Sequence, residues 1–329
     1  MEDRIENLLS FCSALDFGAV KLSGGEKEFC RELNNEVIAL CKSLPGSTQI
    51  DALLCLRGYF RIPFGQEFSF FMNYYVPAWS IIYWLIQSAP EGKGLKQEDI
   101  QNAKTAHAMA LFLHPLDDHL NDGELPVTHL TLLLRSHAWM IMNNAFSSLA
   151  DEVDGGEEIV ESFLDDYYSS LRSSKEILSL DSYCDFFRKQ MATGFIAPVL
   201  IMRKMTANEE FTHAIQAAYG SFGIAWRLLD DINDIKTDMM KGAKSSIYIC
   251  LPEDLKNYWK KQSEEELDKK DGYFKVILDY ILKDSVIERI KERIYGELNS
   301  AATIADDCNM TSWAYEFRSL LRPLKNSRD

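Results

Sequence analysis

Apolar residues recur every three or four positions through most of the chain, which is the spacing that places them on one face of an α-helix. The clearest example covers residues 104–122, where one side would carry Ala106, Ala110, Leu113 and Asp117. The same spacing predicts helices over 128–149, 157–171, 183–205, 211–240, 252–270, 272–298 and 310–321. No segment alternates with the period of two expected of a strand. We therefore predict an all-α fold of roughly ten helices.

Glycine and proline interrupt these helices only at short breaks. The breaks fall at 45–46, 90–94, 123–126, 155–156 and 242. A length of 329 residues permits one large domain or two smaller ones. Because no linker, internal repeat or low-complexity stretch divides the chain, we predict a single domain over residues 1–329.

One stretch is apolar enough to raise the question of a membrane span. Residues 68–87 read FSFFMNYYVPAWSIIYWLIQ, and Asn73 and Pro77 interrupt them. Because of these interruptions we predict a buried helix and no transmembrane segment. The aromatic side chains here, Phe71 and Tyr75 among them, are expected to form either ordinary core or a wall whose π faces bind a cationic intermediate.

Composition narrows the class of protein. Hydrophobic residues make up 47% of the chain and charged residues 26%, the balance of a globular protein. The net charge of −15 argues against a nucleic-acid partner, because phosphate backbones are bound by basic surfaces. The seven cysteines are scattered and none forms a Cys-x-x-Cys pair, which favours reduced thiols in the cytoplasm over zinc sites or disulfides.

Two groups of aspartates interrupt the apolar pattern. The first aspartate group lies in LFLHPLDDHLNDGELP, where Asp118 and Asp122 are four residues apart and would share a helix face beside Asp117. We expect this helix to end at Gly123, so that the carboxylates lie at the negative end of the helix dipole. A bound cation would offset that unfavourable placement.

The second aspartate group lies in GIAWRLLDDINDIKTDMMKGAK, where Asp230, Asp234 and Asp238 are spaced by four and Asp231 is adjacent. These carboxylates stand where leucines would otherwise continue an apolar helix, and apolar surroundings raise the cost of bringing like charges together. The alternative is that each group is only a solvated acidic helix end. We favour a functional site because apolar helix flanks both groups.

Two facing rows of carboxylates suit Mg²⁺, which combines a few carboxylates with phosphate oxygens of a substrate. The predicted metal ligands are Asp117, Asp118, Asp122, Asp230, Asp231 and Asp234. The metal would neutralise a diphosphate as its C–O bond ionises, and Asp118 and Asp230 are the predicted catalytic residues. Nearby basic residues would bind the diphosphate, or else be surface charges: Arg188, Lys189, Arg227, Lys241 and Lys244.

Four histidines lie near the first aspartate group, at positions 107, 114, 119 and 129. A zinc site would need a more closed set of nitrogen and sulfur ligands. We therefore expect these histidines to lie at the surface or to support the aspartates.

These motifs resemble those of the polyprenyl synthetases within the isoprenoid synthase superfamily. WRLLDDINDIKTDMMKGAKSSIYICLP is similar to the family's second aspartate-rich region, and LHPLDDHLNDGELPVTH is similar to its first region and the turn that follows. The likeness covers about 107–145 and 183–252. It implies a helical bundle with a central cavity, an allylic prenyl diphosphate substrate and Mg²⁺, three ions in each active site. Chain-elongating members are usually homodimers, which the resemblance therefore also implies.

The sequence departs from the family where isopentenyl diphosphate would bind. Chain-elongating members usually carry an Arg-Arg-Gly run after the first aspartates, where this chain has residues 123–125, Gly-Glu-Leu. Their upstream Gly-Gly-Lys segment has no clear counterpart, since residues 65–67 near that position read Gly-Gln-Glu, and their Lys-Thr pair appears only as Ala-Thr at residues 192–193. Without those cations, a second diphosphate would meet an acidic pocket that repels it.

We therefore predict a terpene synthase, a cyclase that ionises one allylic diphosphate. Residues 233–241 overlap the terpene-synthase pattern NDxxSxxxE, with Lys241 in place of its glutamate. One alternative is a prenyltransferase that uses isopentenyl diphosphate or another acceptor. The other is a non-catalytic partner of a related synthase, and the intact aspartates of both groups argue against it.

Overall fold

The computed structural model describes residues 2–89, 95–172, 177–206, 208–264 and 267–326. Its longest helices are α5 (Gln97–Asn121), α6 (His129–Ala150), α10 (Glu209–Asn233) and α15 (Val286–Asp307). The other α-helices are α1 (Glu2–Ala14), α2 (Gly24–Ser43), α3 (Gln49–Tyr59), α4 (Val76–Gln87), α7 (Gly156–Leu171), α8 (Leu180–Gln190), α9 (Ala192–Met205), α11 (Ile235–Lys241), α12 (Ser246–Ile249), α13 (Glu253–Glu264), α14 (Leu267–Lys283), α16 (Thr311–Leu320) and α17 (Arg322–Asn326). None of these described residues lies in a strand, and the all-α prediction is confirmed.

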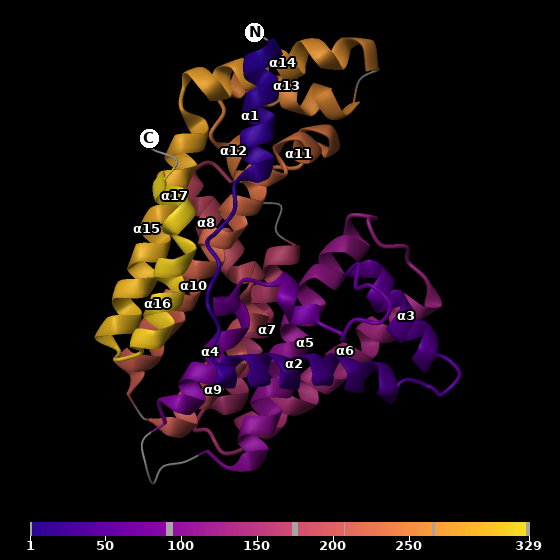
Figure 1. The fold of residues 1–329 in the computed structure, drawn as a ribbon, viewed down its shortest axis with the longest axis vertical. Helices are drawn as coiled ribbons and strands as arrows, with labels where there is room; N and C mark the ends of the chain where they lie inside the picture. The colour runs from indigo at the N-terminus through magenta and orange to yellow at the C-terminus, as the bar shows by residue number, and fades with distance from the viewer. Residues whose placement is uncertain (1, 90–94, 173–176, 207, 265–266, 327–329) are drawn as a thin grey trace.

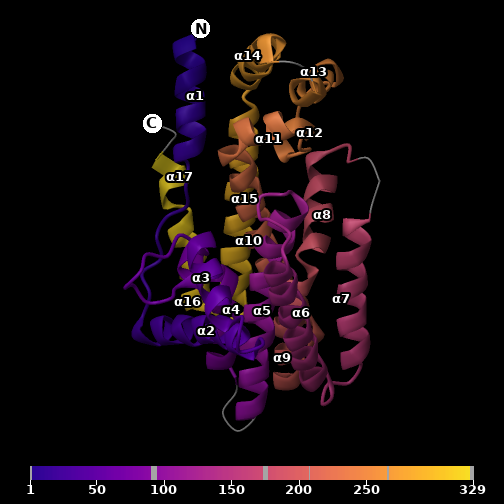
Figure 2. The same cartoon turned by 90° about the vertical axis from the view of Figure 1, so that its right-hand side faces the viewer.

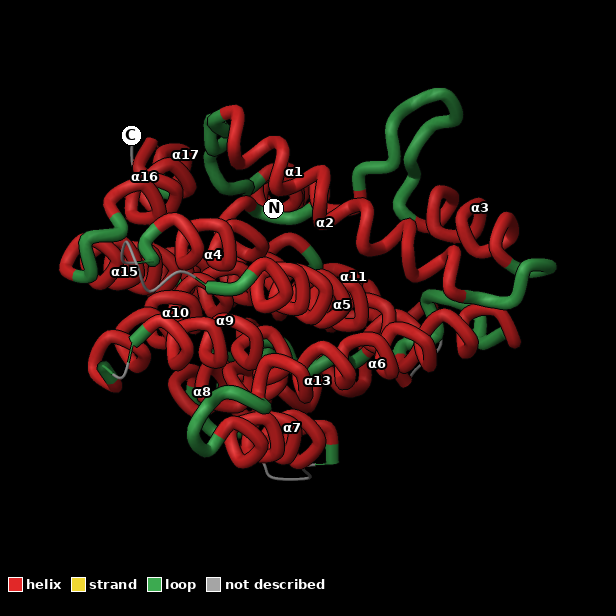
Figure 3. Tube along the Cα trace, turned by 90° about the horizontal axis from the view of Figure 1, so that it is seen from below, coloured by secondary structure: helices red, strands yellow, loops and turns green. Residues whose placement is uncertain are grey.

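The helices pack as a bundle around two central pairs. α6 lies on α5, α15 lies on α10, and α4 and α9 pack between the pairs (Figure 1). α5 and α10 both rise toward the end of the molecule that carries α11 to α14 (Figure 2). Seen from below, loops of different lengths join the helices, and a long one projects beside α3 (Figure 3). The C-terminal ends of α5 and α10 therefore open toward the same end of the bundle.

Three of the predicted helices are each divided in the structure. The segment predicted as 272–298 belongs to α14 and α15, with a break at Asp284 and Ser285. The segment predicted as 183–205 forms α8 and α9 with a break at Met191, and 211–240 forms α10 and α11 with a break at Asp234. Neither of these last two breaks contains glycine or proline, and the apolar period continues across both. Periodicity alone therefore conceals them. The predicted break at 90–94 lies outside the described residues.

The aromatic stretch 68–87 is only partly helical. A 3₁₀ turn, η1 (Phe70–Asn73), precedes α4, and Pro77 occupies the first turn of α4, where its missing N–H leaves no hydrogen bond unmade. The prediction of one helix over the whole stretch is therefore wrong in its first half. Among the described residues, no helix is long and apolar enough to cross a membrane.

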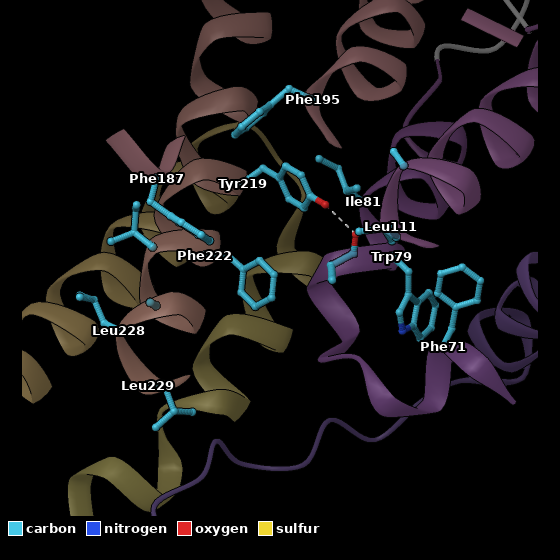
Figure 4. Packing of buried hydrophobic residues seen from close by; sticks show 14 of the residues in the cluster. Phe71, Trp79, Ile81, Leu111, Phe187, Phe195, Tyr219, Phe222, Leu228 and Leu229 are labelled. Atoms are coloured by element: carbon cyan, nitrogen blue, oxygen red, sulfur yellow. Dashed lines mark hydrogen bonds between the residues drawn. The ribbon is translucent and has the colours of Figure 1, made fainter. Parts of the chain in front are cut away.

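The buried apolar side chains form one contiguous cluster. Figure 4 shows part of it, where Tyr219 of α10 points toward Leu111 of α5. The Tyr219 hydroxyl donates a hydrogen bond of 2.8 Å to the carbonyl oxygen of Ala78. This bond satisfies the polar end of a fully buried ring and joins α10 to α4.

A pair of carboxyl groups is buried beside this cluster. Glu316 of α16 accepts hydrogen bonds of 2.6 Å from the Ser80 hydroxyl and from Trp84 Nε1. Glu26 of α2 is also buried and interacts with Glu316. Burial is the main cause that raises the pKa of Glu316 well above its ordinary value, and the neighbouring Glu26 raises it further.

We expect Glu316→Gln to make stability depend less on pH. Because the pKa of Glu316 is raised in the folded state, its contribution to stability is fully present below the unfolded-state pKa of about 4.3 and is lost as the pH rises through the folded-state value. Glutamine has a similar shape and does not ionise. Urea unfolding from pH 5 to pH 9 should show the wild type losing stability relative to the variant, and a constant difference would contradict this expectation.

Candidate active site

Both aspartate groups lie at the C-terminal ends of helices. Asp122 caps α5, and its N–H donates to the carbonyl oxygen of Asp118 at 2.9 Å. Asp234 caps α10, and its N–H donates to the carbonyl oxygen of Asp230 at 2.9 Å. The dipoles of both helices therefore present their negative ends beside the carboxylates, so that both helix ends attract cations.

Asp118 and Asp230 line one cavity of about 180 Å³ between α5, α8, α9 and α10, which we call the aspartate cavity. Both side chains are exposed at its outer end. The deepest residue of α5 in its lining is Ala110, eight residues before Asp118, which corresponds to about 12 Å along the helix. The structure thus brings one aspartate of each group to a shared cavity.

The walls of the aspartate cavity are aromatic. They are formed by Phe187 of α8 and by Tyr219, Phe222 and Trp226 of α10. The three α10 residues share a helix face that continues to Asp230. Their spacing of three and four residues is the signal that could have identified this wall from the sequence.

The aromatic residues that the sequence analysis proposed as the wall, Phe71 and Tyr75, lie outside the aspartate cavity. Phe71 is fully buried, and its N–H donates to Asn34 Oδ1 at 3.1 Å. The Tyr75 hydroxyl donates to Asp16 Oδ1 at 2.5 Å, and its ring lies edge-on to Trp226 with centroids 6.0 Å apart. Neither Phe71 nor Tyr75 lines the aspartate cavity, although Tyr75 supports one of its walls.

Asp117 is bound by neighbouring helices. Arg135 of α6 donates to both of its carboxylate oxygens, at 2.6 and 2.9 Å. Trp139 Nε1 and the Tyr167 hydroxyl also donate to it, at 3.3 and 3.4 Å. A bidentate pair with arginine is a strong and directional contact. Asp117 therefore ties the end of α5 to α6 and α7.

Asp231 is held in a similar way in the second group. Its side chain is 1% exposed, and Arg227 Nε lies 2.9 Å from one of its oxygens. The Tyr183 hydroxyl donates to the same oxygen at 3.1 Å, and the backbone N–H of Ser246 donates to the other at 2.8 Å. Asp231 therefore ties the end of α10 to α8 and α12.

The two adjacent aspartates in each group thus have different surroundings. Asp117 and Asp231 each contact an arginine and a tyrosine, whereas Asp118 and Asp230 line the cavity. Consecutive residues of a helix point about 100° apart, and here the neighbouring helices bind one aspartate of each pair while the other lines the cavity. The metal-binding role of Asp117 and Asp231 stays a prediction, and it competes with the hydrogen bonds that they already make.

Burial and mutual repulsion disfavour ionisation at the second group. About half of the Asp230 side chain stays exposed, but the surrounding protein displaces much of its hydration water, and this desolvation is the main cause that raises its pKa to about 6; Arg227 lowers it, and nearby carboxylates, including Asp118, raise it. Burial likewise raises the pKa of Asp238 to about 7, and it also raises the pKa of Asp234. Carboxylates in such surroundings gain more from a nearby cation than solvated ones do.

Three of the predicted basic residues lie on the side of the second group. Arg227 lines the cavity, and its guanidinium lies 3.8 Å from Asp230 Oδ2. Lys241, at the end of α11, forms an ion pair with Glu124 in the loop after α5, so that this pair links the two aspartate groups. Lys244 is exposed and has no ion pair with a residue that the structure describes.

The other two basic residues line a second cavity of about 550 Å³ beside α7. Arg188 lies 2.6 Å from Asp185 and 3.7 Å from Glu297. Lys189 lies 2.8 Å from Asp166. The structure therefore does not bring Arg188 and Lys189 to the aspartate cavity, and their binding of diphosphate stays an untested prediction.

The aspartates would bind a metal ion only together with the phosphate oxygens of a substrate. In the described part of the chain, no three His, Cys, Asp or Glu side chains converge to hold an ion by themselves. Mg²⁺, however, commonly takes one or two carboxylates and completes its shell with water and substrate phosphates. The side chains of Asp118 and Asp234 are exposed and accept no hydrogen bond from a described side chain, so they are free to act in this way.

No protein-family model matches the sequence, and no curated protein is significantly similar to it. Solved structures are similar to it in fold over nearly its whole length. The geranylgeranyl pyrophosphate synthetase from Pyrococcus horikoshii matches with a TM-score of 0.62 and 13% identity, over 96% of this chain and 99% of that one. The chain has the isoprenoid-synthase fold.

Two further solved structures with the isoprenoid-synthase fold are also similar to this chain. The heptaprenyl diphosphate synthase from Staphylococcus aureus has a TM-score of 0.65 and 11% identity, over 91% of this chain and 98% of that one. A geranylgeranyl pyrophosphate synthase from Corynebacterium glutamicum, complexed with isoprenyl diphosphate and magnesium, has a TM-score of 0.57 and 13% identity, over 92% of this chain and 100% of that one. At such low identity the likeness establishes the fold.

Proposed function

We propose that the protein is a Mg²⁺-dependent terpene synthase that ionises one allylic prenyl diphosphate in the aspartate cavity. The observation that carries this proposal is the meeting of Asp118 and Asp230, on two different helices, at the outer end of one aromatic-walled cavity. An anionic head group held at that end would leave its prenyl chain in the apolar interior. There the π faces would stabilise the positive charge of an allylic cation.

The residues divide into three roles in this proposal. Asp118, Asp122, Asp230 and Asp234 would hold Mg²⁺, which when bound neutralises the charge of the departing diphosphate. Arg227 is the one lysine or arginine among the described residues that line the cavity, and it would bind diphosphate oxygens. Lys244 would approach the diphosphate from the loop after α11, whereas Lys241 could do so only by giving up its ion pair with Glu124. Asp117 and Asp231 would position the two helix ends.

The charges around Glu124 disfavour the binding of a second diphosphate, which chain elongation would require. Its carboxylate pairs with Lys241 and lies 3.5 Å from His119 Nε2, beside the first aspartate group. A second diphosphate approaching here would meet a carboxylate and a lysine that is already neutralised. Like charges at close range oppose its binding.

A prenyl diphosphate synthase is the second candidate, because the similar solved structures are named as prenyl diphosphate synthases. Incubation with geranyl, farnesyl and geranylgeranyl diphosphates distinguishes the two, with and without Mg²⁺ and isopentenyl diphosphate. A terpene synthase releases diphosphate and forms hydrocarbons or alcohols from one of them alone. Longer prenyl diphosphates that appear only with isopentenyl diphosphate would establish the second candidate instead.

A double variant with Asp118→Asn and Asp230→Asn is the control for this experiment. Both side chains are exposed, so the variant should fold and should release no diphosphate. If the wild type forms no product from any of the substrates, the proposed function is wrong. The protein would then be better explained as the non-catalytic partner of a related synthase.

We expect Ala110→Phe to shorten the longest substrate that the protein accepts. Ala110 is 2% exposed and lines the inner part of the aspartate cavity, away from the charged groups. A phenyl ring there would occupy space needed by the far end of a long prenyl chain. The value of kcat/KM for the longest accepted diphosphate should fall at least about tenfold, or about 1.4 kcal/mol, while a shorter one is less affected. Equal losses for both would indicate general damage.

A further inference from the structure

One basic group in the aspartate cavity has no role in the proposed function. His114 lies on α5 one helical turn before Asp118, which places it about 6 Å deeper along the helix. Its ring lies edge-on to Phe187, with centroids 6.4 Å apart. Neither ring nitrogen forms a hydrogen bond with a residue that the structure describes. The sequence placed this histidine at the surface or in support of the aspartates, whereas the structure places it in the cavity lining.

Apart from Asp118 and Asp230, which would hold the metal at the outer end, the other candidate proton acceptors of the cavity are already engaged. His119 Nδ1 is hydrogen-bonded to the Tyr59 hydroxyl, and its Nε2 faces Glu124 at 3.5 Å. The Tyr219 hydroxyl donates to a backbone carbonyl oxygen at 2.8 Å. The Thr193 hydroxyl is a very weak base. Among the described residues of the lining, His114 therefore offers the accessible imidazole lone pair.

The surroundings of His114 favour its neutral form. Burial is the main cause that lowers its pKa below the ordinary value. Asp118 and Asp117 oppose this effect, whereas Arg227 of α10 and His119 add to it. A neutral imidazole can accept a proton, and an imidazolium that forms would gain from the nearby carboxylate of Asp118.

We propose that His114 is the catalytic base that ends the carbocation reaction, so that the product is an alkene. The inference rests on the proposed function. The C–O bond of the substrate first breaks, and its electron pair leaves with the diphosphate. A C–H bond next to the cationic carbon then breaks, its electron pair becomes the new C=C bond, and the proton moves to a ring nitrogen of His114. The imidazolium returns this proton to water after the product leaves.

The position of the ring matches this step. Diphosphate held at Asp118 and Asp230 places the ionised carbon at the outer end of the cavity. His114 lies one turn further in, beside the part of the prenyl chain that follows that carbon. Phe187, against its edge, helps to keep water out, so that proton loss competes well with capture by water.

His114→Phe and His114→Asn test the proposal in the full-length protein with Mg²⁺ and the accepted diphosphate. Phenylalanine keeps the ring contact with Phe187, and asparagine keeps a polar side chain without a basic nitrogen. Diphosphate release should stay within about threefold of the wild type in at least one variant. The share of the main alkene should fall at least about tenfold, with alcohols or other alkenes in its place.

His119→Gln is the matched control, because it removes a second imidazole from the same lining. Its alkene share should resemble that of the wild type, whatever its rate. An unchanged product distribution in both His114 variants would overturn the proposal and would indicate that the departing diphosphate takes the proton. Wild-type protein that releases diphosphate without forming an alkene would overturn it too, while leaving the ionisation intact. Absence of diphosphate release would instead refute the proposed function, and this inference with it.

A second measurement needs no turnover. Proton–nitrogen correlation spectra of the histidine rings at pH 7, assigned with the His114→Asn variant, should show His114 as neutral imidazole. A charged imidazolium at that pH would exclude it as the base.

Discussion

Asp118→Asn should lower kcat/KM for the accepted prenyl diphosphate by about a thousandfold, or about 4 kcal/mol, with little effect on stability. The Asp118 carboxylate is exposed at the outer end of the aspartate cavity and accepts no hydrogen bond from a described side chain. Removing its charge therefore breaks no contact that holds the fold. It removes a group that the proposed chemistry needs when the diphosphate departs.

Asp117→Asn, one residue away, should mainly lower the stability of the protein and should lower its activity only a little. This carboxylate neutralises Arg135 and accepts hydrogen bonds from Trp139 and Tyr167. The amide cannot satisfy both guanidinium donors, so unfolding should become easier by about 1 to 3 kcal/mol. Activity should fall much less than in Asp118→Asn if, as we propose, Asp117 only positions the end of α5.

Both variants are measured by urea unfolding and by diphosphate release under the same conditions. The contrast between two adjacent aspartates controls for the general loss of a negative charge near α5. Equal losses of activity in the two variants, with equal stabilities, would mean that Asp117 also reaches the substrate. The division of roles inside the first aspartate group would then be wrong.

The largest loss of stability is expected for Asp231→Ala. The Asp231 side chain is 1% exposed and contacts Arg227, Tyr183 and the backbone N–H of Ser246. Removing Asp231 leaves the half-buried Arg227 with only its longer contact of 3.8 Å to Asp230, and breaking such an ion pair typically costs about 3 kcal/mol. The variant also loses the hydrogen bond that joins α10 to α12.

Urea unfolding without Mg²⁺ measures this loss directly, and Asp234→Ala is the control. Asp234 is exposed and accepts no hydrogen bond from a described side chain, so its removal should change stability by less than about 0.5 kcal/mol. Equal stabilities for Asp231→Ala and Asp234→Ala would show that Asp231 does not support the fold. A loss of activity without a loss of stability in Asp231→Ala would favour the metal-binding role predicted from the sequence.

The fold class and the positions of the two aspartate groups could be predicted from the sequence alone. The apolar period predicts an all-α fold, because a helix buries the residues that return to one face every three or four positions. Two aspartate groups at the ends of long helices were also visible, since Asp118 and Asp122 break an apolar pattern just before a glycine. The resemblance in those motifs pointed to the isoprenoid-synthase fold, which the structure and its similar solved structures confirm.

Only tertiary packing decided which residues of the two aspartate groups line the cavity and which contact neighbouring helices. Periodicity assigns a residue to a helix face, and it contains no information on which neighbouring helix meets that face. The sequence therefore grouped Asp117 with Asp118, whereas the packing of α6 and α7 directs Asp117 to Arg135 and leaves Asp118 in the cavity. For the same reason, the aromatic wall came from α8 and α10, and His114 entered the cavity lining.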